Sequence, residues 1–211
     1  MIPWLLAIKF ENMQRTPKPL KNPELEGISA EQLKQHHDVL YAGYVKKLAE
    51  IEEALPKADI SKANATYSEL GELLRQQAFA TNGVTLHEWY FEGLVKGGHA
   101  PTADLKSAVE AQLASWDNFI AMFKASGMSA RGWVVLAYSL YDSALHLYTQ
   151  DAHDKGAVWA CVPLLIMDVY EHAYMIDYGV KRKDYIEAFF KNVDWQVVGQ
   201  RYLNVNKLKL Q

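Results

Sequence analysis

The sequence predicts an α+β protein in which an all-helical N-terminal half precedes a C-terminal half with a small antiparallel sheet. Three observations support this prediction. Apolar residues recur at helical spacing as far as Gly127, with capping residues before the runs and proline or glycine after them. After Gly132, short β-branched and aromatic runs alternate with polar turns, which is typical of strands. Helical spacing then returns after Asp168.

A helical hairpin is expected first. Residues 9–28 hold prolines among charged residues and predict an extended lead-in. Ser29 and Gln32 have the spacing of a capping box, so a helix is expected from there to about Pro56. A second helix is expected to begin near Ser61 and to pack against the first.

A third helical stretch is expected after Asn82-Gly83, which we predict to interrupt the second helix. It ends before Gly97-Gly98 and Pro101, which leave few local hydrogen bonds to cross. We therefore predict an N-terminal domain over residues 1–98 and a C-terminal domain over residues 99–211.

The C-terminal half is expected to form one sheet with helices around it. Its strands are predicted to follow one another as an antiparallel meander. The expected elements are one long helix over 102–127, strands over 133–138, 144–148 and 157–162, and helices over 184–190 and 194–202.

The composition indicates an ordinary soluble protein, since 50% of the residues are hydrophobic and 22% are charged. A formal net charge of −3 gives no general attraction to nucleic acid. No apolar run reaches membrane length, and Met1–Ile8 lacks the basic flank and cleavage site of a secretory signal. The single cysteine, Cys161, has no internal partner. We expect a cytoplasmic protein without nucleic-acid or membrane partners.

The segment after Asp168 carries the chemistry. Asp168 and His172 are four residues apart, which separates them by roughly 13 Å on a strand. In a helical turn their Cβ atoms come within roughly 5–6 Å of each other. A turn after Asp168 would therefore aim both groups at one point, as in a metal site. The alternative is a satisfied polar pair at a strand end.

A metal that does chemistry needs at least three protein ligands. His36 and His87 each lie on an otherwise apolar helix face, where a lone histidine is more often a satisfied core residue. Together with Asp168 and His172 they would supply three imidazoles and one carboxylate. This set accepts iron, manganese or zinc and does not choose among them.

Residues 168–174 read Asp-Val-Tyr-Glu-His-Ala-Tyr. This string resembles the metal signature of the iron/manganese superoxide dismutase family, Asp-Val-Trp-Glu-His-Ala-Tyr, with Tyr170 in place of tryptophan. The resemblance extends over about residues 27–206. It includes His36 before Tyr44-Val45, His87 before Glu92-Gly93-Leu94, Gly132-Trp133, Asp177-Tyr178, Asp184-Tyr185 and Asn192-Val193-Asp194-Trp195.

The resemblance implies an enzyme that dismutes superoxide to dioxygen and hydrogen peroxide, with one iron or manganese ion per chain. Its implied ligands are His36, His87, Asp168 and His172. Among its further implications, Tyr44 is a gateway residue, Trp133 lines the pocket and Arg182 steers the substrate. For Tyr44 the alternative is an amphipathic core tyrosine.

The resemblance also implies a homodimer, with further pairing into a tetramer left open. Glu171 would bridge to the ligand histidine of the other subunit. The family usually has a histidine where this chain has Leu40 and a tyrosine where it has Met175. Because both polar partners have become apolar, we expect Leu40 and Met175 to face each other across the two-fold axis.

The sequence leaves undecided which outer residue contacts the metal-bound solvent. Iron members often have a glutamine at the position of Gly83, whereas manganese members supply one from the later hairpin. Gln150 and His153 both lie near that hairpin position. We favour His153, although a solvated turn histidine is the alternative, and we favour iron over manganese.

Two other readings remain at this stage. One is a non-haem iron protein that uses two histidines and one carboxylate for oxygen chemistry on an organic substrate. The other is a catalytically impaired homologue that binds metal, which the changes at Leu40 and Met175 make plausible.

Overall fold

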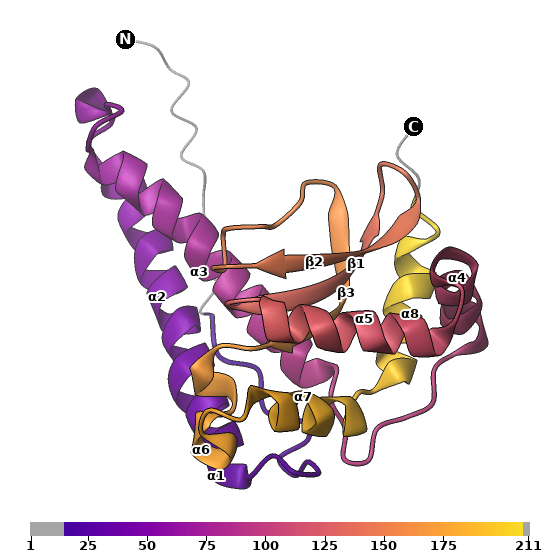
Figure 1. Cartoon of the computed structure of the whole chain (residues 1–211). Helices are drawn as coiled ribbons and strands as arrows, with labels where there is room; N and C mark the ends of the chain where they lie inside the picture. The colour runs from indigo at the N-terminus through magenta and orange to yellow at the C-terminus, as the bar shows by residue number, and fades with distance from the viewer. Residues whose placement is uncertain (1–14, 209–211) are drawn as a thin grey trace.

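An N-terminal helical hairpin lies beside a three-stranded sheet with flanking helices in the computed structural model, which describes residues 15–208 (Figure 1). This arrangement confirms the predicted α+β fold class. The segment Met1–Ile8, on which the expectation of a missing secretory signal depended, lies outside the described residues. The division into domains at residues 98 and 99 stays a prediction.

The first arm of the hairpin changes its hydrogen-bonding pattern along its length. It consists of α1 (Ala30–Lys34), the π-helix η1 (Gln35–Tyr41), α2 (Ala42–Ala54) and the 3-10 turn η2 (Leu55–Lys57). The Ser29 hydroxyl accepts from the Gln32 amide, 3.1 Å away, so the predicted cap is confirmed. The reciprocal half of the capping box was wrong, because the Ser29 amide donates to Asp177 instead of to the Gln32 side chain. The π-helical segment was not predicted, because its wider turn leaves no distinct sequence pattern.

The second arm is one continuous helix, α3 (Glu69–Glu92), capped by Ser68. The predicted start near Ser61 was wrong, because Ile60–Lys62 form only a short 3-10 turn, η3. The predicted interruption at Asn82-Gly83 was also wrong. Gly83 stays helical at a cost of about 1 kcal/mol. A Cβ atom there would lie 3.0 Å from Cδ1 of Tyr44, so the close packing of the two arms explains the glycine.

The single helix expected over residues 102–127 is two helices, α4 (Ala103–Leu113) and α5 (Trp116–Ser129). Thr102 caps α4 as predicted. The break occurs at Ala114, which has a φ of 65°, and Ser115 caps α5. The apolar periodicity continues across the break, so the sequence pattern did not indicate Ser115 as the start of a new helix.

The strands are β1 (Trp133–Ser139), β2 (Ala144–Gln150) and β3 (Cys161–Asp168). They are antiparallel as predicted, but the meander was wrong, since the order is β2-β1-β3. All residues of β1 are buried, which suits the central position. The third strand begins later than expected, because Ala160 adopts a φ of 61° just before it. The last helices, α7 (Arg182–Lys191) and α8 (Trp195–Val205), are close to the predicted ranges.

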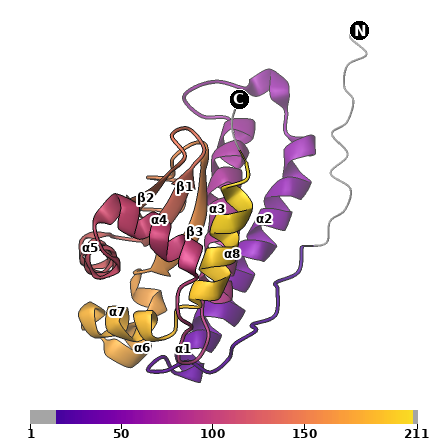
Figure 2. The same cartoon turned by 90° about the vertical axis from the view of Figure 1, so that its right-hand side faces the viewer.

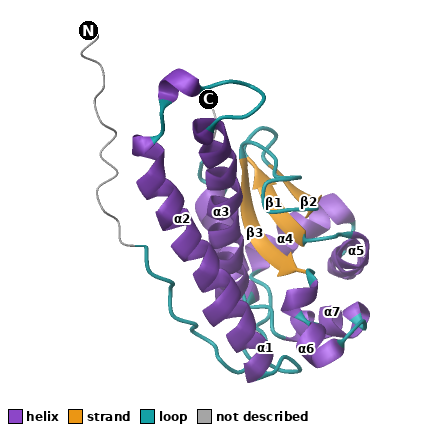
Figure 3. Ribbon diagram, turned by 90° about the vertical axis from the view of Figure 1, so that its left-hand side faces the viewer, coloured by secondary structure: helices purple, strands orange, loops and turns teal. Residues whose placement is uncertain are grey.

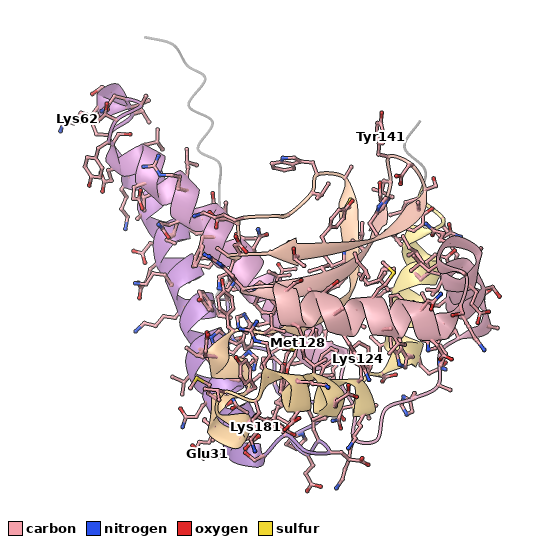
Figure 4. The ribbon with its side chains drawn as sticks, in the orientation of Figure 1. Glu31, Lys62, Lys124, Met128, Tyr141 and Lys181 are labelled. Carbon is pink, nitrogen blue, oxygen red and sulfur yellow. The ribbon has the colours of Figure 1, made fainter. Side chains whose placement is uncertain are left out.

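Helices lie on both sides of the sheet. Figure 2 shows α4 and α5 on one side, and Figure 3 shows α3 running beside β3 on the other. Lys62 marks the far end of the hairpin and Tyr141 the turn between β1 and β2 (Figure 4). The end of the hairpin opposite Lys62 meets the C-terminal end of β3, since His36 and His87 lie near Asp168. No helix within residues 15–208 is long and apolar enough to cross a membrane.

Candidate metal centre

Four side chains from four elements converge where the hairpin meets the sheet. His36 lies on η1, His87 on α3, Asp168 at the end of β3 and His172 in the 3-10 turn η4 (Glu171–Ala173). One ligand atom of each residue lies within 4.8 Å of those of the other three. These are the four residues that the sequence predicted as ligands.

The turn after Asp168 brings His172 back toward the carboxylate. Nε2 of His172 lies 3.1 Å from Oδ2 of Asp168. The buried amide of Gln32 on α1 holds this turn, since its Nε2 donates to the His172 carbonyl at 2.6 Å and its Oε1 accepts from the Ile176 amide at 3.1 Å. The helix that leads to His36 is therefore fastened directly to the turn that carries His172.

The two carboxylate oxygens of Asp168 have different surroundings. Oδ1 accepts from the backbone amide of Tyr170 at 2.9 Å. Oδ2 lies 3.1 Å from Nε2 of His36 and 3.7 Å from Nε2 of His87. The main-chain oxygen of Asp168 accepts from the hydroxyl of Tyr185 at 2.7 Å. Oδ2 is therefore the oxygen that faces the imidazoles.

His87 offers a bare nitrogen to the centre. Its Nδ1 lies 2.6 Å from the Gly83 carbonyl, which only accepts, so Nδ1 carries the proton. Its Nε2 is buried without a hydrogen-bond partner among the described residues. Burial lowers the pKa of His87 to about 3, which keeps the ring neutral. A buried lone pair of this kind suits a metal ion.

Burial and the attraction between the carboxylate and the imidazoles shift the pKa values of the other three residues. Burial lowers the pKa of His36 despite the neighbouring Asp168. Burial alone would raise the pKa of Asp168, but the imidazoles of His172 and His36 lower it. Burial alone would lower the pKa of His172, but the Asp168 carboxylate raises it. The carboxylate is therefore ionised at neutral pH.

These observations fit a transition-metal ion. The unpartnered nitrogen of His87 and the carboxylate oxygen converge in a buried space. The four ligand atoms lie within 4.8 Å of one another, so the cluster could hold one metal ion. Three imidazoles with one carboxylate are a suitable donor set for iron or manganese.

Three of the predicted outer residues lie beside the cluster. The indole nitrogen of Trp133 donates to Nδ1 of His153 at 3.0 Å, and both residues are buried. The ring centroid of Tyr44 lies 4.7 Å from that of His153 and 5.4 Å from that of His87. Burial raises the pKa of Tyr44, which therefore keeps its proton. His153 is thus not the solvated turn histidine of the alternative.

Gln150 lies directly opposite Trp133 in the register of β1 and β2, so both side chains are on one face of the sheet. The residue is buried, and its Oε1 has no hydrogen-bond partner among residues 15–208. No hydrogen bond within the described residues joins its side chain to Tyr44 or to the four converging side chains.

The predicted interface residues lie at the surface of the single chain. Met175 is 45% exposed, Glu171 is exposed and Leu40 is half-buried. Their exposed apolar neighbours are Val39 and Ile176. These positions are compatible with a contact to a second subunit, which stays a prediction.

Arg182 makes structural contacts. Its Nη1 donates to the Ala130 carbonyl at 2.7 Å and its Nε to the Tyr174 hydroxyl at 3.2 Å. The side chain is half-buried, so its guanidinium joins α7 to the segment that leads into β1. The steering role stays a prediction.

Sequence reasoning missed several residues that support the cluster. Asn82 donates to the His153 carbonyl at 2.8 Å, and the Phe79 ring centroid lies 4.6 Å from that of His153. Gln32 was considered only as part of a capping box. Each acts on a residue far away in the chain, so no local pattern indicates it.

The comparisons with known proteins agree with this geometry. The family described as "Iron/manganese superoxide dismutases, C-terminal domain" matches residues 101–201. An iron superoxide dismutase of Aquifex pyrophilus is 43% identical over 187 residues, covering 87% of this chain and 88% of that protein. An iron superoxide dismutase of Cupriavidus metallidurans is 37% identical over 88% of this chain and 94% of its own length.

A manganese superoxide dismutase of Haloarcula marismortui is 33% identical over 197 residues, covering 92% of this chain and 95% of that protein. Relatives with either metal therefore match almost the whole sequence. From this identity over most of its length, the chain belongs to the iron/manganese superoxide dismutase family.

Proposed function

We propose that this chain is a metal-dependent superoxide dismutase that converts superoxide to dioxygen and hydrogen peroxide. His36, His87, Asp168 and His172 would hold one iron or manganese ion. The observation that carries the proposal is the convergence of these four side chains within 4.8 Å in a member of this family.

The chemistry supplied by the bound ion is a one-electron couple between the +3 and +2 states. Three neutral imidazoles and one carboxylate keep the net charge of the site moderate in both states. The buried ring of His87 and the ionised Asp168 are already in the protonation states that metal binding requires.

Formation of hydrogen peroxide requires protons, and two residues beside the cluster hold them. Tyr44 keeps its phenol proton because burial raises its pKa. Because the Trp133 indole only donates, Nδ1 of His153 must accept, and a neutral His153 therefore carries its proton on Nε2. We propose that Tyr44 and His153 orient solvent and protons at the site, and that Trp133 holds His153 in this tautomer.

Small anions would approach along the hairpin. A hollow of about 300 Å³ between α2 and α3 is lined by Leu40, Tyr44 and Phe79, among others. Tyr44 contacts both this hollow and the ring of His87, which suits a gateway role. Arg182 would contribute positive potential to the steering of superoxide.

His153 is the better candidate for the outer residue, and Gln150 the weaker one. His153 is hydrogen-bonded to Trp133 and packs edge-on against Tyr44, whereas the Oε1 of Gln150 has no hydrogen-bond partner within the described residues. We favour iron over manganese, since the relatives from Aquifex and Cupriavidus are named iron enzymes. Metal analysis of protein purified from cells given both metals tests this preference.

We also propose a homodimer whose interface includes Glu171, Leu40 and Met175, with a tetramer left open. The exposed apolar side chains of Val39 and Ile176 support this choice of face. Leu40→His would place one polar group against Met175 of the other subunit, and an unpaired buried polar group costs about 1–3 kcal/mol. Sedimentation should show weaker dimers for this variant, and an unchanged equilibrium would exclude Leu40 from the interface.

Metal analysis combined with a superoxide-consumption assay tests the main proposal. One iron or manganese ion per chain with activity supports it. Metal without activity indicates the impaired homologue, and oxygen chemistry on an organic substrate indicates the non-haem iron protein. The cytoplasmic location is a separate prediction, which cell fractionation tests.

A further inference from the structure

Tyr170 belongs to the segment that carries Asp168 and His172. Its side chain reaches from there to the turn that carries His153. We infer that Tyr170 is a positioning residue whose hydroxyl holds His153 in place beside the cluster. The inference rests on the proposed function in one respect, namely that His153 acts at the metal site.

The hydroxyl of Tyr170 donates to the main-chain carbonyl of Asp151 at 2.9 Å. Asp151 begins a tight turn that ends at Lys155, since the Asp151 amide donates to the Lys155 carbonyl at 3.2 Å. His153 lies at the centre of this turn and is only 2% exposed, although Asp151 and Asp154 are exposed. The hydroxyl therefore holds the start of the turn that buries His153.

The ring of Tyr170 is itself fixed by the metal-binding segment. Its backbone amide donates to Oδ1 of Asp168 at 2.9 Å. Its ring stacks on His172 with 5.3 Å between the centroids and 21° between the planes. It also packs against Gly132, where an added Cβ would lie 2.7 Å from Cε2 of Tyr170. A ring held by these contacts gives its hydroxyl a defined position.

Other contacts hold His153 from different directions. Trp133 bonds to its ring and Asn82 to its carbonyl, at 3.0 and 2.8 Å. The hydrogen bond from the Tyr170 hydroxyl to the Asp151 carbonyl joins this turn to the segment that carries Asp168 and His172. Position 170 is also where residues 168–174 depart from the family string, and the hydroxyl is the atom that makes the contact.

Tyr170→Phe tests the inference, because it keeps the stacked ring and removes only the hydroxyl. Hydrogen exchange of peptides covering residues 149–158 should become about threefold to tenfold faster, as expected for the loss of one hydrogen bond. Tyr178→Phe is the matched control, since its hydroxyl donates to the Gly27 carbonyl at another place in the fold. Unchanged exchange in Tyr170→Phe, or an equal change at this turn in the control, would overturn the inference.

A double-mutant cycle with His153→Ala tests whether Tyr170 acts through His153. The midpoint potential of the metal-loaded protein should shift in Tyr170→Phe and in His153→Ala. Tyr170→Phe should add no further shift when His153 is already absent. An equal shift in both backgrounds, or no shift in Tyr170→Phe while His153→Ala gives one, contradicts the inference.

Both measurements separate this inference from the proposed function. Hydrogen exchange and the midpoint potential require a folded protein with bound iron or manganese, not dismutase activity. A metal-loaded chain without activity would refute the proposed function, and the exchange and the cycle would still decide the role of Tyr170.

Discussion

The four converging side chains and the residues around them are built in different ways. His36, His87 and Asp168 are at most 1% exposed, and each has its place fixed by its own helix or strand end. His153 and Tyr170 are held instead by hydrogen bonds between different segments of the chain, such as the 3.0 Å bond from Trp133 to His153 and the 2.9 Å bond from Tyr170 to Asp151.

This difference predicts two kinds of response to substitution. A change in the inner cluster leaves several buried polar groups without partners at once, so its effect should be all or none. A change in the outer residues removes about one hydrogen bond, worth about 0.5–1.5 kcal/mol, so its effect should be graded.

Asp168→Ala should give the largest effect. It removes the only carboxylate of the cluster and the acceptor for His36 and His172. We expect loss of bound metal and a fall in activity of at least about 100-fold, beyond the range of outer residues. Metal content by mass spectrometry is the measurement, and Asp177→Asn, an exposed carboxylate that also accepts a backbone amide, is the control. Full metal occupancy in Asp168→Ala would place the metal elsewhere.

Removal of the metal should lower the thermal stability next. An ion present at 100 times its dissociation constant stabilises the native state by about 2.7 kcal/mol. At about 2–4 °C per kcal/mol for a chain of this size, chelation should lower Tm by about 5–10 °C. Without the ion, the buried Nε2 of His87 has no hydrogen-bond partner among the described residues, and this unpaired polar atom destabilises the folded chain. If calorimetry gave equal Tm values for the metal-loaded and the metal-free protein, the cluster would be a polar network that is stable without the ion.

The same contrast explains what the sequence could and could not predict. The pairing of Asp168 with His172 follows from short-range spacing, because a turn after Asp168 brings His172 near it. His36 and His87 were predicted instead from their apolar helix faces and from the family resemblance. The helices and the three strands follow from periodicity in the same way. Gln32, Asn82 and Phe79 were missed because their roles arise only when distant segments pack together.

Errors in the fold have the same origin. Asn82-Gly83 reads locally as a helix break, but the close approach of Tyr44 makes this glycine part of a continuous helix. The meander was wrong because the succession of three strand-like runs does not indicate which strand lies in the centre, and the fully buried β1 takes that place.

Substitution of the two outer candidates should give a smaller and unequal response. His153→Ala removes the acceptor for Trp133 and the ring beside Tyr44, so kcat/KM should fall about tenfold, at the lower end of outer-residue effects. Gln150→Ala should stay within about twofold, because no described hydrogen bond depends on its Oε1. Steady-state kinetics at fixed metal content decides between them. A larger fall for Gln150→Ala would reverse our assignment.

A small effect is also expected at Arg182, where charge and hydrogen bonding can be separated. Arg182→Lys keeps the charge but loses the bonds to Ala130 and Tyr174, so it should mainly lower stability, by about 0.5–1.5 kcal/mol. Arg182→Gln loses the charge as well. If the charge steers superoxide, kcat/KM at low salt should fall by about twofold to threefold in this variant only, with a weaker dependence on ionic strength. An equal fall in both variants would make Arg182 a structural residue, whose influence on the site passes through the start of β1.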